Sequence, residues 1–142
     1  MTPTPVSSPR FQALDLLATL VAVVRGDGTV LFANSALEDA VGSSRRTIEG
    51  ASFLPLFARP EILRVALDGA ARNEYASLRY DAELIRPHGD PLPVHVVLAQ
   101  TETADEFVVE LLPLEQQARQ DREARRIGQA EANKELIRNL AH

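Results

Sequence analysis

The stretch "LVAVVRGDGTVLFAN" (residues 20–34) consists of two apolar runs separated by a turn. Asp27 and Gly28 tolerate the positive φ angles that a tight β-hairpin requires. The stretch therefore predicts two antiparallel strands. The segments on either side of this hairpin have other periodicities, and they determine the rest of the predicted fold.

The hairpin leads directly into "SALE" (Ser35–Glu38), which matches a capping box. In that motif the hydroxyl oxygen of Ser35 accepts a hydrogen bond from the backbone amide of Glu38, and the Glu38 side chain reaches back to the cap. We therefore expect a short helix from Ser35 to about Val41. Gly42 would end this helix, because glycine readily adopts the conformation that follows a last helical turn.

Two kinds of sequence precede the hairpin. Residues 1–10 contain three of the nine prolines and show no periodicity, so we expect them to be disordered. Residues 11–20, "FQALDLLATL", carry apolar side chains at helical spacing. This spacing predicts a short amphipathic helix over Phe11–Leu20.

Further helical segments follow the capped helix. Residues 43–57 are broken by Gly50 and Pro55, which indicates short helical turns around a cavity. Residues 60–73, "PEILRVALDGAARN", begin with a proline in the first turn and predict a longer helix. Gly69 would end that helix early.

The next part of the chain is β-like. Three segments, Tyr75–Pro87, Leu92–Thr101 and Phe107–Leu114, are separated by the turn sequences "HGD" and "TADE". Three consecutive strands with short links form a meander. With the hairpin they predict an α+β domain over residues 11–114, in which helices lie on one face of a five-stranded antiparallel sheet.

Residues 115–142 have a different composition. They contain no proline, one glycine and mainly Gln, Arg, Glu and Ala, which are strong helix formers. A long helix is predicted, but its apolar positions are sparse, so we expect it to pair with a second copy as a coiled coil. A frayed or disordered tail is the alternative.

Composition limits the classes of function. The chain has no cysteine, which excludes zinc–thiolate sites, iron–sulfur clusters and thiol nucleophiles. The net charge of −5 argues against a nucleic-acid partner. The sequence begins without a signal peptide and its longest apolar run is "LVAVV", so we expect a soluble cytoplasmic protein that does not cross a membrane.

The predicted order of elements resembles that of a PAS domain, a sensory module of many bacterial signalling proteins. The segment "GTVLFANSALEDAVG" (residues 28–42) is similar to the start of that family. The ending "NKELIRNLAH" (residues 133–142) resembles the start of the phosphoacceptor motif of histidine kinases, in which Glu and then Asn-Pro follow the histidine. Within that superfamily, residues 110–142 resemble the nitrogen-regulation sensor kinases of the NtrB type.

The resemblance implies a role for one residue, His142, as the phosphorylated histidine. Residues 115–142 would then be a signalling helix that leads into a dimerisation and histidine-phosphotransfer domain. ATP and Mg²⁺ would bind in a kinase domain beyond these residues, so residues 1–142 alone are expected to be inactive and to hold no cofactor. The implied partners are a second copy of the chain, a response regulator of the NtrC type and the PII signal protein.

Other candidate sites have ordinary interpretations. His88 lies in a turn and His95 on a strand, and both are expected to be surface or sheet residues. Haem-binding PAS domains place a histidine on the long helix, and residues 60–73 contain none. A set of apolar residues could line a pocket for flavin or another ligand, but core packing explains it equally well; the set is Phe53, Leu54, Leu56, Phe57, Ile62, Leu63 and Leu67.

The rival interpretation is a stand-alone PAS module that binds a ligand or a protein. In that case residues 115–142 would serve as a dimerisation stalk, and His142 would have no catalytic role.

Overall fold

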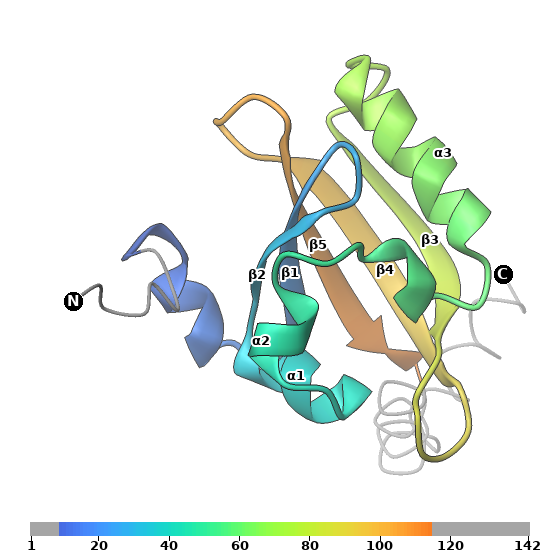
Figure 1. Ribbon diagram of the computed structural model, residues 1–142. Coiled ribbons are helices and arrows are strands. Elements are labelled where there is room, and N and C mark those ends of the chain that lie inside the picture. The colour runs from blue at the N-terminus through green and yellow to red at the C-terminus, as the bar shows by residue number, and fades with distance from the viewer. Residues whose placement is uncertain (1–8, 115–142) are drawn as a thin grey trace, which may run out of the picture.

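The computed structural model describes residues 9–114 (Figure 1). The predictions for residues 1–8 and 115–142, including the signalling helix and His142, lie outside them. The elements in chain order are η1 (Pro9–Leu16), β1 (Leu20–Arg25), β2 (Val30–Ala33), α1 (Ser35–Val41), α2 (Arg45–Ile48), η2 (Leu54–Leu56), α3 (Pro60–Ala71), β3 (Ser77–Leu84), β4 (Leu92–Gln100) and β5 (Glu106–Pro113).

The strands form one five-stranded sheet in the order β2-β1-β5-β4-β3. Every neighbouring pair is antiparallel. β1 and β2 are the predicted hairpin, and β3, β4 and β5 are the predicted meander. The prediction of an α+β fold with a five-stranded antiparallel sheet is confirmed.

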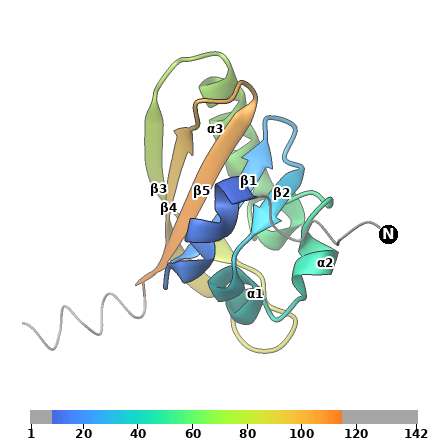
Figure 2. The same ribbon diagram turned by 90° about the vertical axis from the view of Figure 1, so that its left-hand side faces the viewer.

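The inner face of the sheet carries the main core. Side chains alternate along β4, where Leu92, Val94, Val96 and Leu98 are buried and the residues between them are half-buried. α1, α2 and α3 cover this face (Figures 1 and 2). The alternation places one apolar row against the helices, as expected for a sheet with one covered face.

η1 lies on the opposite face of the sheet (Figure 2). Val21, Val23 and Phe32 are buried but do not belong to the main core cluster on the inner face. The ring of Phe11 lies 5.5 Å from that of Phe32, measured between centroids. This end of the sheet is therefore covered on both faces.

The predicted amphipathic helix over Phe11–Leu20 is wrong in type and length. The segment is a 3₁₀ helix that ends at Leu16, and β1 already begins at Leu20. The side-chain amide of Asn34 donates to the carbonyls of Leu14 and Thr19, 3.0 and 2.9 Å away. These bonds hold the chain in a bend between the two carbonyls, where a continuous helix cannot pass.

The helix cap was predicted one residue too late. α1 does begin at Ser35 and does end before Gly42, which has φ 78°. The N-cap, however, is Asn34, whose side chain accepts from the amide of Leu37. Glu38 does not reach back to the cap, because its carboxylate accepts from the amide of Arg45 at 2.7 Å.

The predicted early end of the long helix at Gly69 is also wrong, because α3 runs to Ala71. A Cβ atom on residue 69 would lie 2.7 Å from the Tyr75 hydroxyl oxygen and 2.9 Å from a ring carbon of Tyr75. Glycine therefore occupies this position to let the Tyr75 ring lie against the helix.

Candidate functional site

The sequence predicted one site residue, His142, which lies outside the described residues. His88 is exposed, and His95 is half-buried on β4 with its Nδ1 atom 2.8 Å from the Asp81 carboxylate. Between residues 9 and 114, three or more potential metal ligands nowhere cluster together. None of the helices in this part of the chain combines the length and apolar character needed to cross a membrane.

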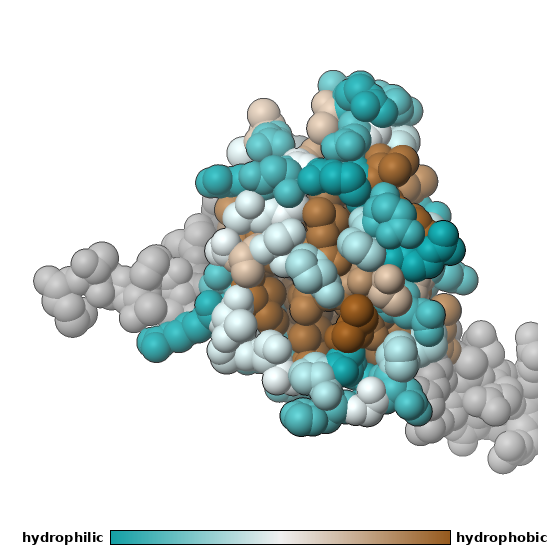
Figure 3. Space-filling view, turned by 45° about the vertical axis from the view of Figure 1, so that its right-hand side comes forward, coloured by the Kyte–Doolittle hydropathy of each residue, from teal (hydrophilic) through white to brown (hydrophobic). Residues whose placement is uncertain are grey.

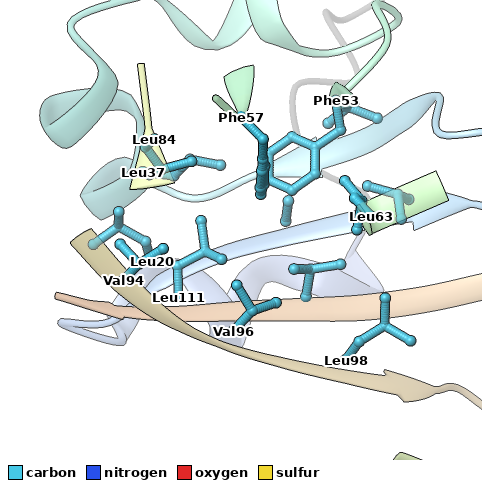
Figure 4. Packing of buried hydrophobic residues seen from close by; sticks show 14 of the residues in the cluster. Leu20, Leu37, Phe53, Phe57, Leu63, Leu84, Val94, Val96, Leu98 and Leu111 are labelled. Carbon is cyan, nitrogen blue, oxygen red and sulfur yellow. The ribbon is translucent and has the colours of Figure 1, made fainter. Parts of the chain in front are cut away.

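The apolar set that could have lined a pocket packs mainly as core. Phe53, Phe57, Leu63 and Leu67 are each at most 2% exposed. The rings of Phe53 and Phe57 meet edge to face, with centroids 5.0 Å apart. Figure 4 shows both rings directed toward the side chains of the sheet. The interior between the helices and the sheet is thus occupied by large side chains of the protein itself.

Asn34 is a buried polar residue that joins three elements. Its Oδ1 atom accepts from the amides of Val21 in β1 and Leu37 in α1, both at 3.0 Å. Its Nδ2 atom donates to the carbonyls of Leu14 and Thr19. An asparagine side chain offers two acceptor positions and two donors, and all four are used.

A second group of contacts fixes η1 to α1 and α2. The Asp15 carboxylate accepts from the Ser35 amide at 3.0 Å and from the Arg45 guanidinium at 2.7 Å. The Arg45 guanidinium also lies over the Phe32 ring, 5.4 Å from its centroid. We call Asp15, Asn34, Ser35 and Arg45 the N-terminal latch.

The carboxylate of Glu49 contributes to the same region. It accepts from the amide of Ala33 at 3.0 Å. Burial raises the pKa of Glu49, although this hydrogen bond and the nearby Arg45 guanidinium act in the opposite direction.

The latch is connected to β5, the last strand of the described residues. The Thr19 hydroxyl donates to the Glu110 carboxylate on β5 at 2.7 Å. β5 is the middle strand of the sheet and is paired with β1 over Leu20–Arg25. Asn34, which bonds to Leu14 in η1, also bonds to Thr19. A displacement of η1 would therefore be passed to β5 through Asn34 and Thr19.

A groove lies between α3 and the edge strand β3, with a cavity volume of about 420 Å³. We call it the α3–β3 groove and define it by Ile62, Val65, Gly69, Tyr75, Leu78 and Tyr80. Three charged residues, Glu61, Arg72 and Glu74, also line it. Val65 is 68% exposed, and Figure 3 shows apolar surface among polar residues on this side of the molecule.

Both tyrosines of the chain lie in this groove. The Tyr75 hydroxyl donates to the carbonyl of Ala66 in α3. The Tyr80 hydroxyl is buried and has no hydrogen-bond partner within residues 9–114. Burial, with a smaller contribution from nearby Tyr75, raises the pKa of Tyr80 to about 12, so this hydroxyl remains a donor at neutral pH.

No protein-family model and no curated protein sequence matches the chain. Solved structures do match. A PAS domain of an HTR-like protein from Haloarcula marismortui has a TM-score of 0.60 at 18% identity, covering 73% of this chain and 91% of that chain. A domain of a sensory box sensor histidine kinase/response regulator from Geobacter sulfurreducens has a TM-score of 0.59 at 16% identity, covering 75% and 98%.

A third similar structure is the PAS domain of nitrogen regulation protein NR(II) from Vibrio parahaemolyticus. Its TM-score is 0.58 at 18% identity, and the match covers 75% of this chain and 99% of that chain. These similarities, together with the observed strand order, show that residues 9–114 have the PAS fold. PAS domains of sensor histidine kinases are among the structures that share it.

Sequence reasoning missed both the latch and the groove. Asp15 and Arg45 are separated by 30 positions, and no sequence motif around either residue predicts that they form an ion pair. The groove had one signal in the sequence, which is that the only two tyrosines of the chain lie five residues apart in one predicted strand, Tyr75–Pro87.

Proposed function

We propose that the chain is the sensory and dimerising part of a cytoplasmic two-component histidine kinase of the nitrogen-regulation, NtrB type. Three observations support this role. Residues 9–114 have the PAS fold, and a nitrogen regulation protein is among the structures with that fold. The sequence that follows β5 is polar, rich in helix formers and ends in "NLAH", like a helix that leads to a phosphoacceptor.

In this proposal His142 receives the γ-phosphoryl group of ATP. An imidazole nitrogen attacks the terminal phosphorus, the bond to the leaving ADP oxygen breaks, and the phosphoryl group later passes to an aspartate of an NtrC-type response regulator. A histidine suits this task because its neutral form is a nucleophile near neutral pH. ATP and Mg²⁺ would be held by a separate kinase domain, on which the PII protein would act.

The PAS domain would set the geometry of a homodimer. The end of η1 exposes Leu16, which is 87% exposed, and the next residue, Leu17, is 44% exposed. An exposed apolar pair at the end of a short helix supports a contact with a second copy. The latch and the Thr19–Glu110 bond would carry a change at that contact into β5 and the signalling helix.

The observation that carries the proposal is the position of β5. It lies in the middle of the sheet, hydrogen-bonded to both β1 and β4, and the phosphoacceptor-like sequence follows it in the chain. A bias of a few kcal/mol between two arrangements of the dimer is enough to switch kinase and phosphatase states.

The test is autophosphorylation of the protein encoded by the complete reading frame, incubated with radiolabelled ATP. We expect acid-labile label on the protein and its loss in His142→Gln. His95→Gln is the control and should be labelled normally. A stop codon directly after codon 142, or equal labelling of both variants, would remove the basis of the proposal.

A stand-alone PAS module that binds a ligand is the second candidate. The α3–β3 groove favours it, because it is a mainly apolar cavity between a helix and the edge strand of the sheet. A PAS module of this kind would bind its ligand without any phosphorylation of His142.

A further inference from the structure

β3 forms one edge of the sheet, and part of that edge is open. Figure 2 shows β3 at the outer side of the sheet, with α3 behind the sheet rather than beside the strand. An edge strand presents backbone N–H and C=O groups that can pair with another extended chain. The hydrogen-bond register of β3 shows which of its residues do so.

Alternate residues of β3 direct their backbone groups away from β4. The Ala76 carbonyl, just before the strand, accepts from the Gln100 amide on β4. The pairing continues along the whole strand without a register shift, so even-numbered residues face β4 and odd-numbered residues face outward. Ser77, Arg79 and Asp81 therefore present backbone N–H and C=O groups to which no other described residue is bonded.

The protein already pairs an extended segment with the other end of this edge. Residues 56–58 lie antiparallel to β3 and are held by two backbone hydrogen bonds, at 2.8 and 2.9 Å. In one of them the Glu83 carbonyl accepts from the Ala58 amide. The chain then leaves the edge and enters α3, which begins at Pro60. The edge thus accommodates an added antiparallel strand, and residues 77–81 are left without one.

Two opposite charges restrict which strand can pair there. Arg79 and Asp81 are exposed, two positions apart, and so lie on the same face of the sheet. Arg79 has no carboxylate partner within residues 9–114, and Asp81 remains 68% exposed although it contacts His95. Like charges directly opposite each other are unfavourable, so charges at an edge discourage unselective pairing. A strand with an acidic residue opposite Arg79 and a basic residue opposite Asp81 would gain two ion pairs.

The other face of an added strand would lie on the side of the α3–β3 groove. Leu78 and Tyr80 alternate with the two charged residues and line that groove. Strand residues opposite them would extend its apolar surface, to which the 68% exposed Val65 also contributes. In an antiparallel strand the complementary order is therefore basic, apolar, acidic, apolar, from the N-terminus to the C-terminus.

We propose that the open edge of β3, residues 77–81, binds an extended peptide of a partner protein as a sixth, antiparallel strand. The peptide places a basic side chain opposite Asp81, an acidic side chain opposite Arg79 and apolar side chains opposite Leu78 and Tyr80. The interaction is independent of the kinase role, because neither phosphotransfer nor His142 takes part in it.

The test titrates the isotope-labelled full chain with synthetic peptides, up to millimolar concentration, and follows the backbone amides by NMR. The matched peptide contains Lys-Val-Glu-Val-Thr, and the control peptide exchanges the charges, as Glu-Val-Lys-Val-Thr. The matched peptide should bind saturably and should slow hydrogen exchange at the amides of Arg79 and Asp81. The control peptide should bind about tenfold more weakly, because two cross-strand pairs become repulsive.

A double variant tests the charge complementarity. Arg79→Glu combined with Asp81→Lys keeps the net charge and should reverse the preference, so that the control peptide binds more tightly than the matched one. Recovery of binding by the control peptide would also show that the double variant is folded. An unchanged preference would overturn the proposal.

Methylated peptides test the addition of a strand. In the matched peptide, N-methylation of Glu removes the N–H that would donate to the Arg79 carbonyl, and binding should be lost. N-methylation of the Val before it should be tolerated, because that N–H points away from β3. No binding at millimolar concentration, or equal binding of the two methylated peptides, would overturn the proposal. Slow exchange of the Arg79 and Asp81 amides without peptide, increasing with protein concentration, would show instead that a second copy of the chain occupies the edge.

Discussion

The side chain of Asn34 forms hydrogen bonds with the backbone of Leu14 in η1, 20 positions earlier in the chain, and at the same time caps α1. This one buried residue thus connects η1, β1 and α1. We expect the stability and the geometry of this end of the domain to depend on it.

Replacing Asn34 tests this connection directly. Asn34→Leu keeps a side chain of similar size but leaves two amides and two carbonyls without their partner. We expect a loss of about 3 kcal/mol or more in the free energy of unfolding, since each buried unpaired group costs roughly 1–3 kcal/mol. Urea unfolding measures this change.

Ser35→Ala is the matched control for that substitution. The sequence identified Ser35 as the helix cap, whereas the structure assigns the cap to Asn34. Ser35→Ala should therefore cost less than about 0.5 kcal/mol, because it removes only exposed hydroxyl contacts. A larger effect for Ser35→Ala than for Asn34→Leu would show that the cap is at Ser35.

The Asp15–Arg45 pair should contribute measurably to stability. Their side chains are only 27% and 14% exposed, and the nitrogen–oxygen distance is 2.7 Å. A double-mutant cycle with Asp15→Asn and Arg45→Gln should give a coupling of about 1 kcal/mol. The same cycle at Arg59 and Glu61, 74% and 64% exposed, should give a coupling near zero. Equal couplings would mean that the latch contributes no more than a surface pair.

Gly69→Ala should have an effect of opposite sign in two backgrounds. In the wild type the added Cβ would collide with Tyr75, so we expect destabilisation by about 1 kcal/mol or more. In Tyr75→Ala the space is free, and the same change should stabilise α3 by roughly 0.5–1 kcal/mol through helix propensity. Thermal or urea unfolding of the wild type, the two single variants and the double variant measures both effects. Stabilisation by Gly69→Ala in both backgrounds would exclude a close contact between residue 69 and Tyr75.

Alkaline pH should destabilise the protein through Tyr80. The pKa of this hydroxyl is raised from 10.0 to about 12 by burial, so the folded state holds its proton more strongly than the unfolded state does. The stabilisation of the protonated form is complete below pH 10 and is lost as the pH rises from 10 through 12. After allowance for partial solvent screening, the loss is roughly 1–2 kcal/mol.

The chain is well suited to that measurement, because it has two tyrosines and no tryptophan. Near-ultraviolet absorbance should show both tyrosines ionising above pH 10, since burial also raises the pKa of Tyr75. In Tyr80→Phe, stability should fall less steeply over this range. An ordinary pKa of 10 for Tyr80 would mean that its hydroxyl is hydrated.

The sheet could be predicted because the sequence patterns that indicate it lie within the strands and turns themselves. The alternation of Val94, Val96 and Leu98 with the residues between them depends on strand geometry alone, and the Asp27-Gly28 turn marks the hairpin directly. The end of α1 at Gly42 was found for the same reason, since a left-handed residue after a helix has a sequence signature.

The predictions from sequence were wrong where contacts with residues distant in the chain determine the local structure. Asn34 and Ser35 are both good caps, and only the backbone groups of η1 and β1 select Asn34. Gly69 has the sequence signature of a helix end, but Tyr75 occupies the space beside it. The groove and the latch likewise need the folded arrangement, because their members come from separate elements.

The last prediction concerns the homodimer. Leu16 is 87% exposed on η1, and a carboxylate placed there would have to be desolvated in an apolar contact between two copies. Leu16→Asp should therefore shift the full chain from dimer to monomer in sedimentation experiments. Val65→Asp, at a 68% exposed position on the other side of the sheet, should leave the dimer intact.

Removal of residues 115–142 separates the two possible origins of the dimer. If η1 forms the contact, residues 1–114 should still dimerise and should still respond to Leu16→Asp. A dimer that resists Leu16→Asp but disappears with residues 115–142 would place the contact in the C-terminal segment. Monomers for both chain lengths would leave the signalling proposal without its mechanical basis, because relative movement of two protomers is what β5 would transmit.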